Sequence, residues 1–311
     1  MTEDTEIEND SEASKGERIA KRLARAGLCS RRDAERWIEE GRVVVDGTRL
    51  TSPACIVTED SRILVDGKPL PESDRSRLWR YHKPTGLVTS HKDEQGRDTV
   101  FDRLPEGMPR VISIGRLDMN SEGLLLLTND GELARRLELP TTGWVRRYRV
   151  RVHGDPKPEV LASLENGITI DGLAYGPIKA ILDRKQGSNA WLTVSLKEGK
   201  NREIRRVMEH LGWTVSRLIR IAYGPFQLGL LNPGEVDEVP TRVLKEQIGG
   251  NKSRSEGEAK ATPKKPSPAR KAEARKPEGF KKPDGNRAAH ARKTLTLDPA
   301  KKPHANRRRP S

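Results

Sequence analysis

The sequence has few of the residues that build disulfide frameworks, zinc sites or large aromatic cores. Only two of its 311 residues are cysteine and 4% are aromatic. Two cysteines, Cys29 and Cys55, cannot form a disulfide framework or a four-cysteine zinc site. The six histidines are scattered without ligand-like spacing. We therefore expect no metal centre.

Long apolar runs are also missing. No stretch approaches the roughly 20 apolar residues that a membrane-spanning helix needs. The first residues are acidic and contain no apolar signal segment, which argues against secretion. These absences predict a cytoplasmic protein that is not embedded in a membrane.

What the chain has instead is positive charge, and it is unevenly placed. The net charge is +14, of which residues 249–311 carry +13 and residues 1–17 carry −6. The remaining +7 belongs to residues 18–248, the part expected to fold. A basic surplus of this kind is typical of a protein that binds nucleic acid.

Both ends of the chain lack the apolar residues needed for a core. Residues 1–15 are polar and acidic, and residues 249–311 are rich in Lys, Arg, Pro and Ala, with Phe280 as their one aromatic residue. We predict disorder for both segments, because they cannot bury enough apolar surface to offset the entropy of ordering. The basic tail is either a solvated segment or an arm that raises RNA affinity without choosing a sequence, and its charge favours the arm.

Residues 16–71 show the pattern of a small unit with helices and strands. Apolar residues recur at helical spacing from Ile19 and stop at Gly27. Ser30 is a good N-cap for a second helix that ends at Gly41. Short strands at 43–45 and 63–65 each lead into an Asp-Gly turn.

The exposed sides of these two helices carry a run of basic residues. Such a run is usually a solvated face, but cations with few acids among them repel one another unless an anion meets them. The residues here, Arg31-Arg32-Asp33-Ala34-Glu35, Gly41-Arg42-Val43 and Val45-Asp46-Gly47, resemble an S4 domain, a small RNA-binding module. The resemblance implies an S4 domain over residues 16–76, with RNA contacts from Arg18, Arg22, Arg31 and Arg32.

From Leu78 onward, short apolar segments alternate with Gly and Pro turns. Helices are predicted near 156–165 and 201–211. Strands are predicted at 78–82, 111–114, 124–128, 145–152, 177–182, 190–196, 213–221 and 236–239. Many strands with few helices indicate an α+β domain over residues 77–248, built on a mostly antiparallel sheet.

The segment with the most chemical information is residues 115–131, GRLDMNSEGLLLLTNDG. Four consecutive leucines, Leu124 to Leu127, predict a strand that is covered on both faces. The loop before it therefore holds Arg116, Asp118 and Glu122 at the mouth of a core strand, a common place for a reactive group. Taken alone, a loop aspartate is more often a turn or cap residue.

This segment is similar to the signature of the ribosomal RNA pseudouridine synthases of the RsuA, RluB, RluE and RluF type. Two further segments agree with the family: residues 146–152, RRYRVRV, and residues 197–206, KEGKNREIRR, followed by Arg217-Leu218-Ile219-Arg220-Ile221. An S4 domain ahead of the catalytic domain is also the family's usual order. The match departs at Arg146, where a lysine is expected, and at Val207-Met208, which replace a Met-Phe pair.

The resemblance implies isomerisation of a uridine in RNA to pseudouridine, without a nucleotide, metal or other cofactor. By match, Asp118 is the essential carboxylate, Arg205 is its cationic partner, and Tyr148 stacks on the uracil. From its position alone, Tyr148 is a half-buried strand aromatic. Whether Asp118 attacks C1′ or acts otherwise stays open at this point.

The remaining basic residues of the matching motifs are candidates for RNA contact. Arg116 is expected to hold the flipped nucleotide or fill the space it leaves. Phosphate contacts are expected from Lys83, Lys200, Arg202 and Arg206. The segment from Lys200 to Arg206 is equally consistent with a solvated helix start.

The sequence therefore predicts a monomeric ribosomal RNA pseudouridine synthase. The 23S RNA of the large ribosomal subunit is favoured, because a long basic tail behind this domain order resembles the RluB type. The 16S RNA of the small subunit is the alternative substrate. The alternative function is a non-catalytic RNA-binding or ribosome-assembly protein.

Overall fold

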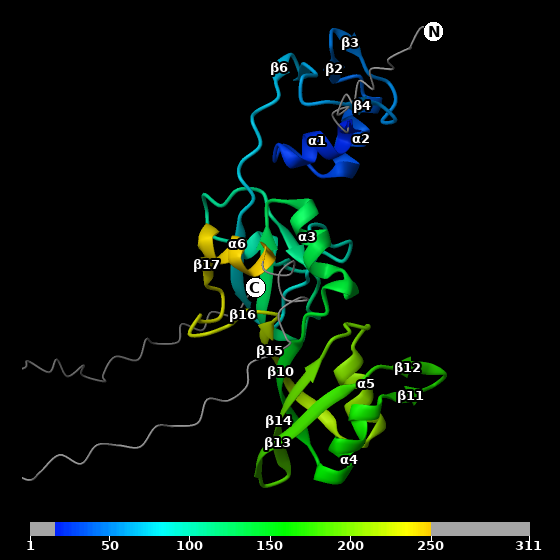
Figure 1. Ribbon diagram of the computed structural model, residues 1–311, viewed down its shortest axis with the longest axis vertical. Coiled ribbons are helices and arrows are strands. Elements are labelled where there is room, and N and C mark those ends of the chain that lie inside the picture. Colours follow the sequence, from blue (N-terminus) through cyan, green and yellow to red (C-terminus); the bar gives the residue numbers. More distant parts are fainter. Residues whose placement is uncertain (1–15, 250–311) are drawn as a thin grey trace, which may run out of the picture. The chain divides into compact units, whose positions relative to one another are not determined.

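The computed structural model describes residues 16–249 (Figure 1). The acidic segment 1–15 and the basic tail beyond residue 249, for which disorder is predicted, lie outside the described residues. Within the described range, no helix has both the length and the apolar character needed to cross a membrane.

The N-terminal unit contains two helices, α1 (Ile19–Arg25) and α2 (Arg31–Glu39). Ser30 begins α2 as predicted: its hydroxyl accepts a 3.1 Å hydrogen bond from the Asp33 backbone N–H, and the Asp33 carboxylate accepts one from the Ser30 N–H. Ile19, Leu23 and Ile38 are fully buried between the helices and the strands. The strands are β1 (Glu17–Arg18), β2 (Val43–Val45), β3 (Thr48–Arg49), β4 (Ile56–Val57), β5 (Ile63–Val65) and β6 (Lys68–Pro69).

Both predicted Asp-Gly turns join paired strands. Val45 pairs with Thr48 and Val65 with Lys68, so each turn has two residues. Asp46 and Asp66 both have φ of 50°, and the glycines that follow also have positive φ. This backbone is the type I′ geometry that matches the twist of a hairpin, and Asp-Gly is one of the few pairs that adopts it at low cost.

The second unit is built on a nine-stranded sheet with the order β13-β14-β10-β15-β9-β7-β17, to which β16 and β8 add at β15 and β9. Every pairing is antiparallel except that of β15 with β9, so the predicted α+β class with a mostly antiparallel sheet is confirmed. The strands are β7 (Leu78–Lys83), β8 (Ile112–Ile114), β9 (Glu122–Thr128), β10 (Arg146–His153), β13 (Ile178–Gln186), β14 (Asn189–Leu196), β15 (Thr214–Tyr223), β16 (Phe226–Gln227) and β17 (Val236–Glu238).

The four leucines of β9 are covered on both faces, as predicted. Leu125 and Leu127 belong to one hydrophobic core, and Leu124 and Leu126 to another. The first core also takes residues from α4 (Pro158–Ser163) and α5 (Glu203–His210). The second takes residues from α3 (Gly131–Glu138) and α6 (Thr241–Gly249). Strand β9 is therefore fully buried and gives the loop before it a rigid base.

The helices differ in part from the prediction. The helix predicted near 156–165 is observed as α4, Pro158–Ser163, followed by a 3₁₀ turn at Leu164–Asn166. The helix predicted near 201–211 is observed as α5, Glu203–His210. Helix α3 was not predicted, although Asp130 caps it by accepting hydrogen bonds from the N–H groups of Glu132 and Leu133. The hairpin of β11 (Ile168–Ile170) and β12 (Leu173–Tyr175) was also not predicted.

Candidate active site

A cavity of about 770 Å³ opens in the second unit. Its lining comes from residues 88–90, residues 115–121, the start of β10, residues 196–204 and the end of β15. Arg116, Asp118, Tyr148, Lys200 and Arg202 all line it, so five of the site residues predicted from sequence lie around one cavity. Arg205 and Arg206 are not among the lining residues.

The loop that carries Asp118 runs from β8 to β9 and is held by hydrogen bonds to its backbone. The Thr89 hydroxyl donates to the Leu117 carbonyl at 2.8 Å, and the Ser121 N–H donates to the Asp118 carbonyl at 3.0 Å. Asp118 is half-buried and Arg116 is exposed. These bonds place a carboxylate at the cavity wall on a backbone that has little freedom to move.

Lys83 is buried against this loop and is not one of the residues that line the cavity. Its side chain is fully buried, and its ammonium group donates to the carbonyls of Pro84, Asp118 and Ser121 at 3.0, 3.2 and 2.9 Å. The cation is thus enclosed by main-chain oxygens, an arrangement that does not favour the predicted phosphate contact. Burial lowers the pKa of Lys83 to about 8, and the Asp118 and Glu122 carboxylates oppose that shift.

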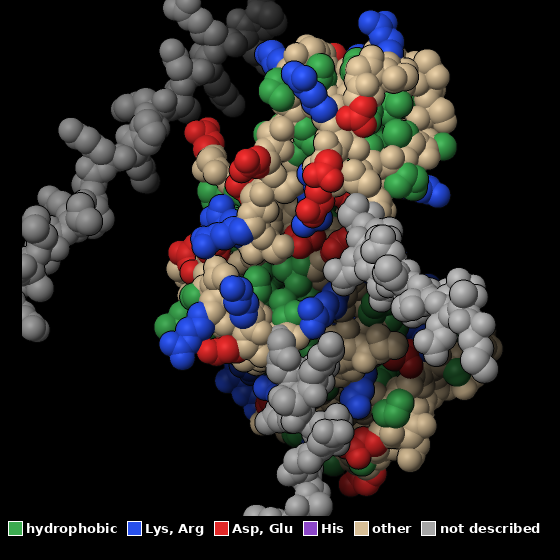
Figure 2. All heavy atoms as spheres, turned by 45° about the horizontal axis from the view of Figure 1, so that its top comes forward, with side chains coloured by type: hydrophobic (Ala, Val, Ile, Leu, Met, Phe, Trp, Pro, Cys, Tyr) green, Lys and Arg blue, Asp and Glu red, His purple; other side chains and the backbone are tan. Residues whose placement is uncertain are grey.

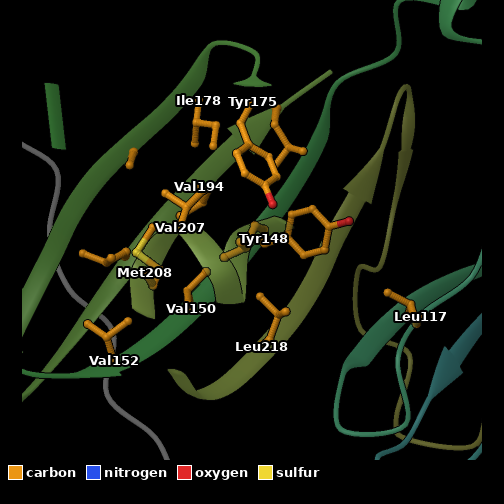
Figure 3. Close-up of a cluster of buried hydrophobic side chains, with 14 of the residues drawn as sticks. Leu117, Tyr148, Val150, Val152, Tyr175, Ile178, Val194, Val207, Met208 and Leu218 are labelled. Atoms are coloured by element: carbon orange, nitrogen blue, oxygen red, sulfur yellow. The ribbon is translucent and has the colours of Figure 1, made fainter. Parts of the chain in front are cut away.

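Tyr148 lies at the edge of the first core, where its side chain is 9% exposed. In Figure 3 the ring stands beside Leu218, with its hydroxyl directed away from the core toward the side of Leu117. Leu117, Tyr148 and Leu218 all line the cavity. The wall near Asp118 thus combines an aromatic ring with two apolar side chains, which suits a flat, weakly polar ring such as a base.

Arg205 approaches the Asp118 loop from α5 but binds its backbone. The guanidinium donates to the carbonyl of Asn120 at 2.7 Å and to that of Val215 at 3.2 Å, rather than to the Asp118 carboxylate. Burial is the main cause that lowers the pKa of Arg205, neighbouring Arg202 lowers it further, and Asp118 opposes both. Arg205 is therefore close enough to Asp118 to interact electrostatically, without a direct ion pair between them.

The other basic residues of this motif are spread around the start of α5. Lys200 pairs with Glu198 and donates to the Ala174 carbonyl at 2.8 Å. Arg202 is exposed and has a φ of 51°, and Arg206 is exposed but does not belong to the cavity lining. Lys200 and Arg202 stand at the cavity rim, whereas Arg206 stands outside it.

Arg220 is a lining residue to which the sequence prediction gave no role. It is 3% exposed, its Nε donates to the Leu124 carbonyl at 2.7 Å, and its buried Nη2 has no hydrogen-bond partner within the described residues. The register pairs Arg220 with Tyr148 across β10 and β15. A charged donor left unpaired in a cavity wall is costly unless a ligand accepts from it. The sequence feature that could have identified Arg220 as a site residue is its place between apolar residues of a predicted strand.

An ion pair joins the strands on either side of the site. Both oxygens of the Glu122 carboxylate accept from the Arg217 guanidinium, at 2.6 and 3.1 Å, and Glu122 is 8% exposed. Glu122 follows the Asp118 loop on β9, while Arg217 is on β15. A two-point pair of this kind restricts orientation, so it helps to hold the loop against β15.

In the N-terminal unit, three of the four predicted RNA-binding residues have accessible side chains. Arg18, Arg31 and Arg32 are exposed. Arg22 is half-buried and pairs with Glu17 at 3.6 Å. The exposed three can reach a phosphate without rearrangement.

Residues 16–249 contain no group of three or more His, Cys, Asp or Glu side chains placed to hold a metal ion. The cavity lining instead contains the carboxylates of Asp118, Glu138 and Glu203, an aromatic wall and several guanidinium groups. These residues can bind an anionic ligand that carries a flat ring, and they place a carboxylate next to that ligand.

Comparison with known proteins agrees with this geometry. Residues 77–210 match the family model for RNA pseudouridylate synthase, and residues 17–63 match that for the S4 domain. An uncharacterized RNA pseudouridine synthase of Rickettsia bellii is 52% identical over 229 residues, which is 74% of this chain and 99% of that protein. The ribosomal large subunit pseudouridine synthase B of Yersinia pestis is 41% identical over 243 residues, 75% of this chain and 76% of that protein.

The fold is shared with a solved structure. A crystal structure of pseudouridylate synthase superposes with a TM-score of 0.54 at 23% identity, covering 74% of this chain and 99% of that one. The extent and identity of the sequence matches settle the family. The chain is an enzyme of the RNA pseudouridine synthase family, with an S4 domain ahead of its catalytic domain.

Proposed function

We propose that this enzyme isomerises a uridine of 23S ribosomal RNA, with Asp118 as the nucleophile. The observation that carries the proposal is the joint lining of one cavity by Asp118, Tyr148 and Arg116. The names of two types of relative support the substrate class: an RNA pseudouridine synthase at 52% identity and a ribosomal large subunit pseudouridine synthase at 41%.

The reaction rearranges one nucleotide without adding or removing atoms. The N1–C1′ bond breaks, the uracil turns while it is still held, and a C5–C1′ bond forms. The proton on C5 is lost and N1 gains one, so no oxidant, reductant or phosphate donor is required. The protein's work is to extract the nucleotide, hold the ring through its turn, and stabilise the sugar when the bond breaks.

Asp118 suits the nucleophilic role because its carboxylate stands at the cavity wall on a fixed loop. Carboxylate attack at an anomeric carbon is the same step that retaining glycosidases use. Arg205, which binds the Asn120 carbonyl beside Asp118, adds positive charge next to the loop that carries this carboxylate. Its role is therefore electrostatic and positional.

Tyr148 supplies the surface on which the uracil rests while it turns. Its ring is nearly buried between apolar neighbours, so stacking costs little further ordering. Arg116 is exposed at the cavity, where it can hold the flipped nucleotide or occupy the space it leaves. The accessible arginines of the S4 domain, Arg18, Arg31 and Arg32, bind RNA phosphates. We propose that the enzyme acts as a cytoplasmic monomer without a metal.

The test is a pseudouridine map of 23S and 16S RNA from cells that lack the gene. We expect one uridine in 23S RNA to be unmodified in these cells and to be restored by the purified wild-type enzyme. Asp118→Asn keeps size and should abolish isomerisation while RNA affinity stays within about twofold, because phosphate contacts dominate affinity. Asp171→Asn is the matched control, since Asp171 is exposed in a hairpin turn that asparagine also adopts.

Each outcome has a definite meaning. Activity in Asp118→Asn rejects the assigned nucleophile. A modification that is missing from 16S RNA instead would identify the RNA of the small ribosomal subunit as the substrate. Unchanged maps of both RNAs, together with tight RNA binding by the purified protein, favour the non-catalytic RNA-binding alternative.

A further inference from the structure

Basic side chains are spread over the described surface (Figure 2), and one group of them is not used by the proposed reaction. Strand β10 places Tyr148, Val150 and Val152 in the first core and therefore directs Arg147 and Arg151 to the opposite side of the sheet. We call this side of β13, β14, β10 and the first half of β15 the reverse face. Its basic residues are Arg147, Arg149, Arg151, Lys179, Arg184 and Arg217.

The reverse face is open in the described part of the chain. Arg147, Arg151 and Lys179 are exposed, and the side chain of Ile181 is 50% exposed. Helices α4 and α5 add their apolar residues to the core on the other side of these strands. This end of the sheet therefore presents a solvent-facing surface that is separate from the cavity.

The basic side chains of the reverse face lie close enough together to repel one another when no anion is bound. Arg151 lies directly opposite Arg217 in the pairing of β10 with β15, and like charges at such positions destabilise a sheet. Within the described residues, acidic partners meet two of the six basic side chains: Asp183 lies 3.8 Å from Arg149, and Glu122 pairs with Arg217. The other four have no acidic partner there. An anion that meets them would relieve the repulsion.

The chemistry of the surface fits nucleic acid. Alternate residues along a strand are about 6.7 Å apart, which is close to the separation of successive phosphates in a nucleic-acid strand. The guanidinium of Arg149 lies 5.0 Å from the centre of the Trp191 ring, and Trp191 is half-buried on this face. Arginine forks with a neighbouring aromatic ring are typical of RNA-binding surfaces.

We propose that the reverse face binds a second segment of the substrate RNA, separate from the segment that carries the target uridine. The argument rests on the proposed function for the identity of the RNA. Tyr148 and Arg147 are adjacent on β10 but face opposite sides of the sheet, so the flipped nucleotide cannot touch both. The two contacts therefore belong to different parts of a large folded RNA.

The test compares two RNAs and two charge-matched variants. Arg147→Gln, Arg151→Gln and Lys179→Gln together remove three exposed charges from the reverse face. The control combines Arg135→Gln, Arg242→Gln and Lys245→Gln, three positions on α3 and α6 that lie outside the reverse face. The RNAs are full-length 23S RNA and a short hairpin that contains only the target uridine and its stem, both of them unmodified.

We expect the reverse-face variant to bind 23S RNA about tenfold more weakly, with the slope of log affinity against log salt reduced by about 2 to 3. Its affinity for the hairpin and its kcat on saturating hairpin should match the wild type. The control variant should lose less than twofold on both RNAs.

Three outcomes overturn the proposal. The first is an equal loss of RNA affinity in the reverse-face variant and the control variant, and the second is an equal loss of affinity for 23S RNA and for the hairpin. The third is an unchanged affinity for 23S RNA, which would indicate that the reverse face binds an acidic protein surface instead. Failure of the proposed function is seen separately, because the wild type would then leave the hairpin unmodified.

Discussion

The ammonium group of Lys83 donates a 3.2 Å hydrogen bond to the backbone carbonyl of Asp118, so a buried cation holds the residue proposed as nucleophile. The same group also binds the carbonyls of Pro84 and Ser121. Replacing it leaves several buried carbonyls without a donor. Lys83 is thus a positioning residue, because it acts on the loop and not on the substrate.

Lys83→Met should therefore lower both stability and turnover. We expect the free energy of unfolding to fall by about 3 kcal/mol, from buried acceptors that lose their donor, as measured by urea denaturation. Turnover should fall with little change in KM, because the carboxylate moves while the RNA contacts remain. Lys92→Met, at an exposed loop position, is the control. Full activity in Lys83→Met would show that the loop keeps its position unaided.

The titration of Lys83 predicts that stability and kcat both depend on pH. Its pKa is about 8 in the folded protein, against 10.5 for an ordinary lysine. Between these values the unfolded chain binds more protons, so this group makes folding more favourable as pH rises from about 8 to 10.5. Deprotonation removes a donor from the loop, so kcat should decline above about pH 8 while stability does not. The kcat profile of Lys83→Met should lack this alkaline decline, and a decline that persists would assign it to another group.

Much of the fold could be predicted because local chemistry decided it. The four leucines of β9 required cover on both faces, Ser30 had the residue three positions later that completes a capping box, and two Asp-Gly pairs fit only tight turns. Helix α3 was missed because its start at Asp130 is equally typical of a turn.

The details of the site could not be predicted in the same way. Lys83 is buried by carbonyls that lie 35 and 38 residues further along the chain, and no local pattern reports such a contact. Arg220 reaches the cavity because β15 pairs in parallel with β9, across nearly a hundred residues. The sequence motifs predicted Asp118 and Tyr148 as site residues. The residues that hold them in place are brought there by the strand pairing of the sheet, which the motifs do not report.

Arg220→Met tests whether the unpaired Nη2 serves the substrate. We expect kcat/KM to fall by about 10² to 10³, the usual effect of removing one well-placed donor. Stability should change little. Replacing a buried guanidinium that has no carboxylate partner within residues 16–249 is favourable, but the Leu124 carbonyl loses its donor. Arg220→Lys, which keeps the charge but not the fork, should recover part of the activity. A fall in melting temperature that parallels the loss of activity would assign Arg220 a purely structural role.

Gly123→Ala tests the contact on which the site is built. Gly123 pairs with Arg220 where β9 meets β15, and it has a φ of +102°. A Cβ there would lie 2.3 Å from the Arg220 carbonyl oxygen, so the strands would have to separate. We expect a loss of at least about 3 kcal/mol in the free energy of unfolding. The control is Gly172→Ala, with a φ of +77° and no atom within 4 Å of the added carbon, which should cost only about 1 kcal/mol. Equal losses in the two variants would mean that backbone strain alone, and not the approach of β9 to β15, makes glycine necessary at position 123.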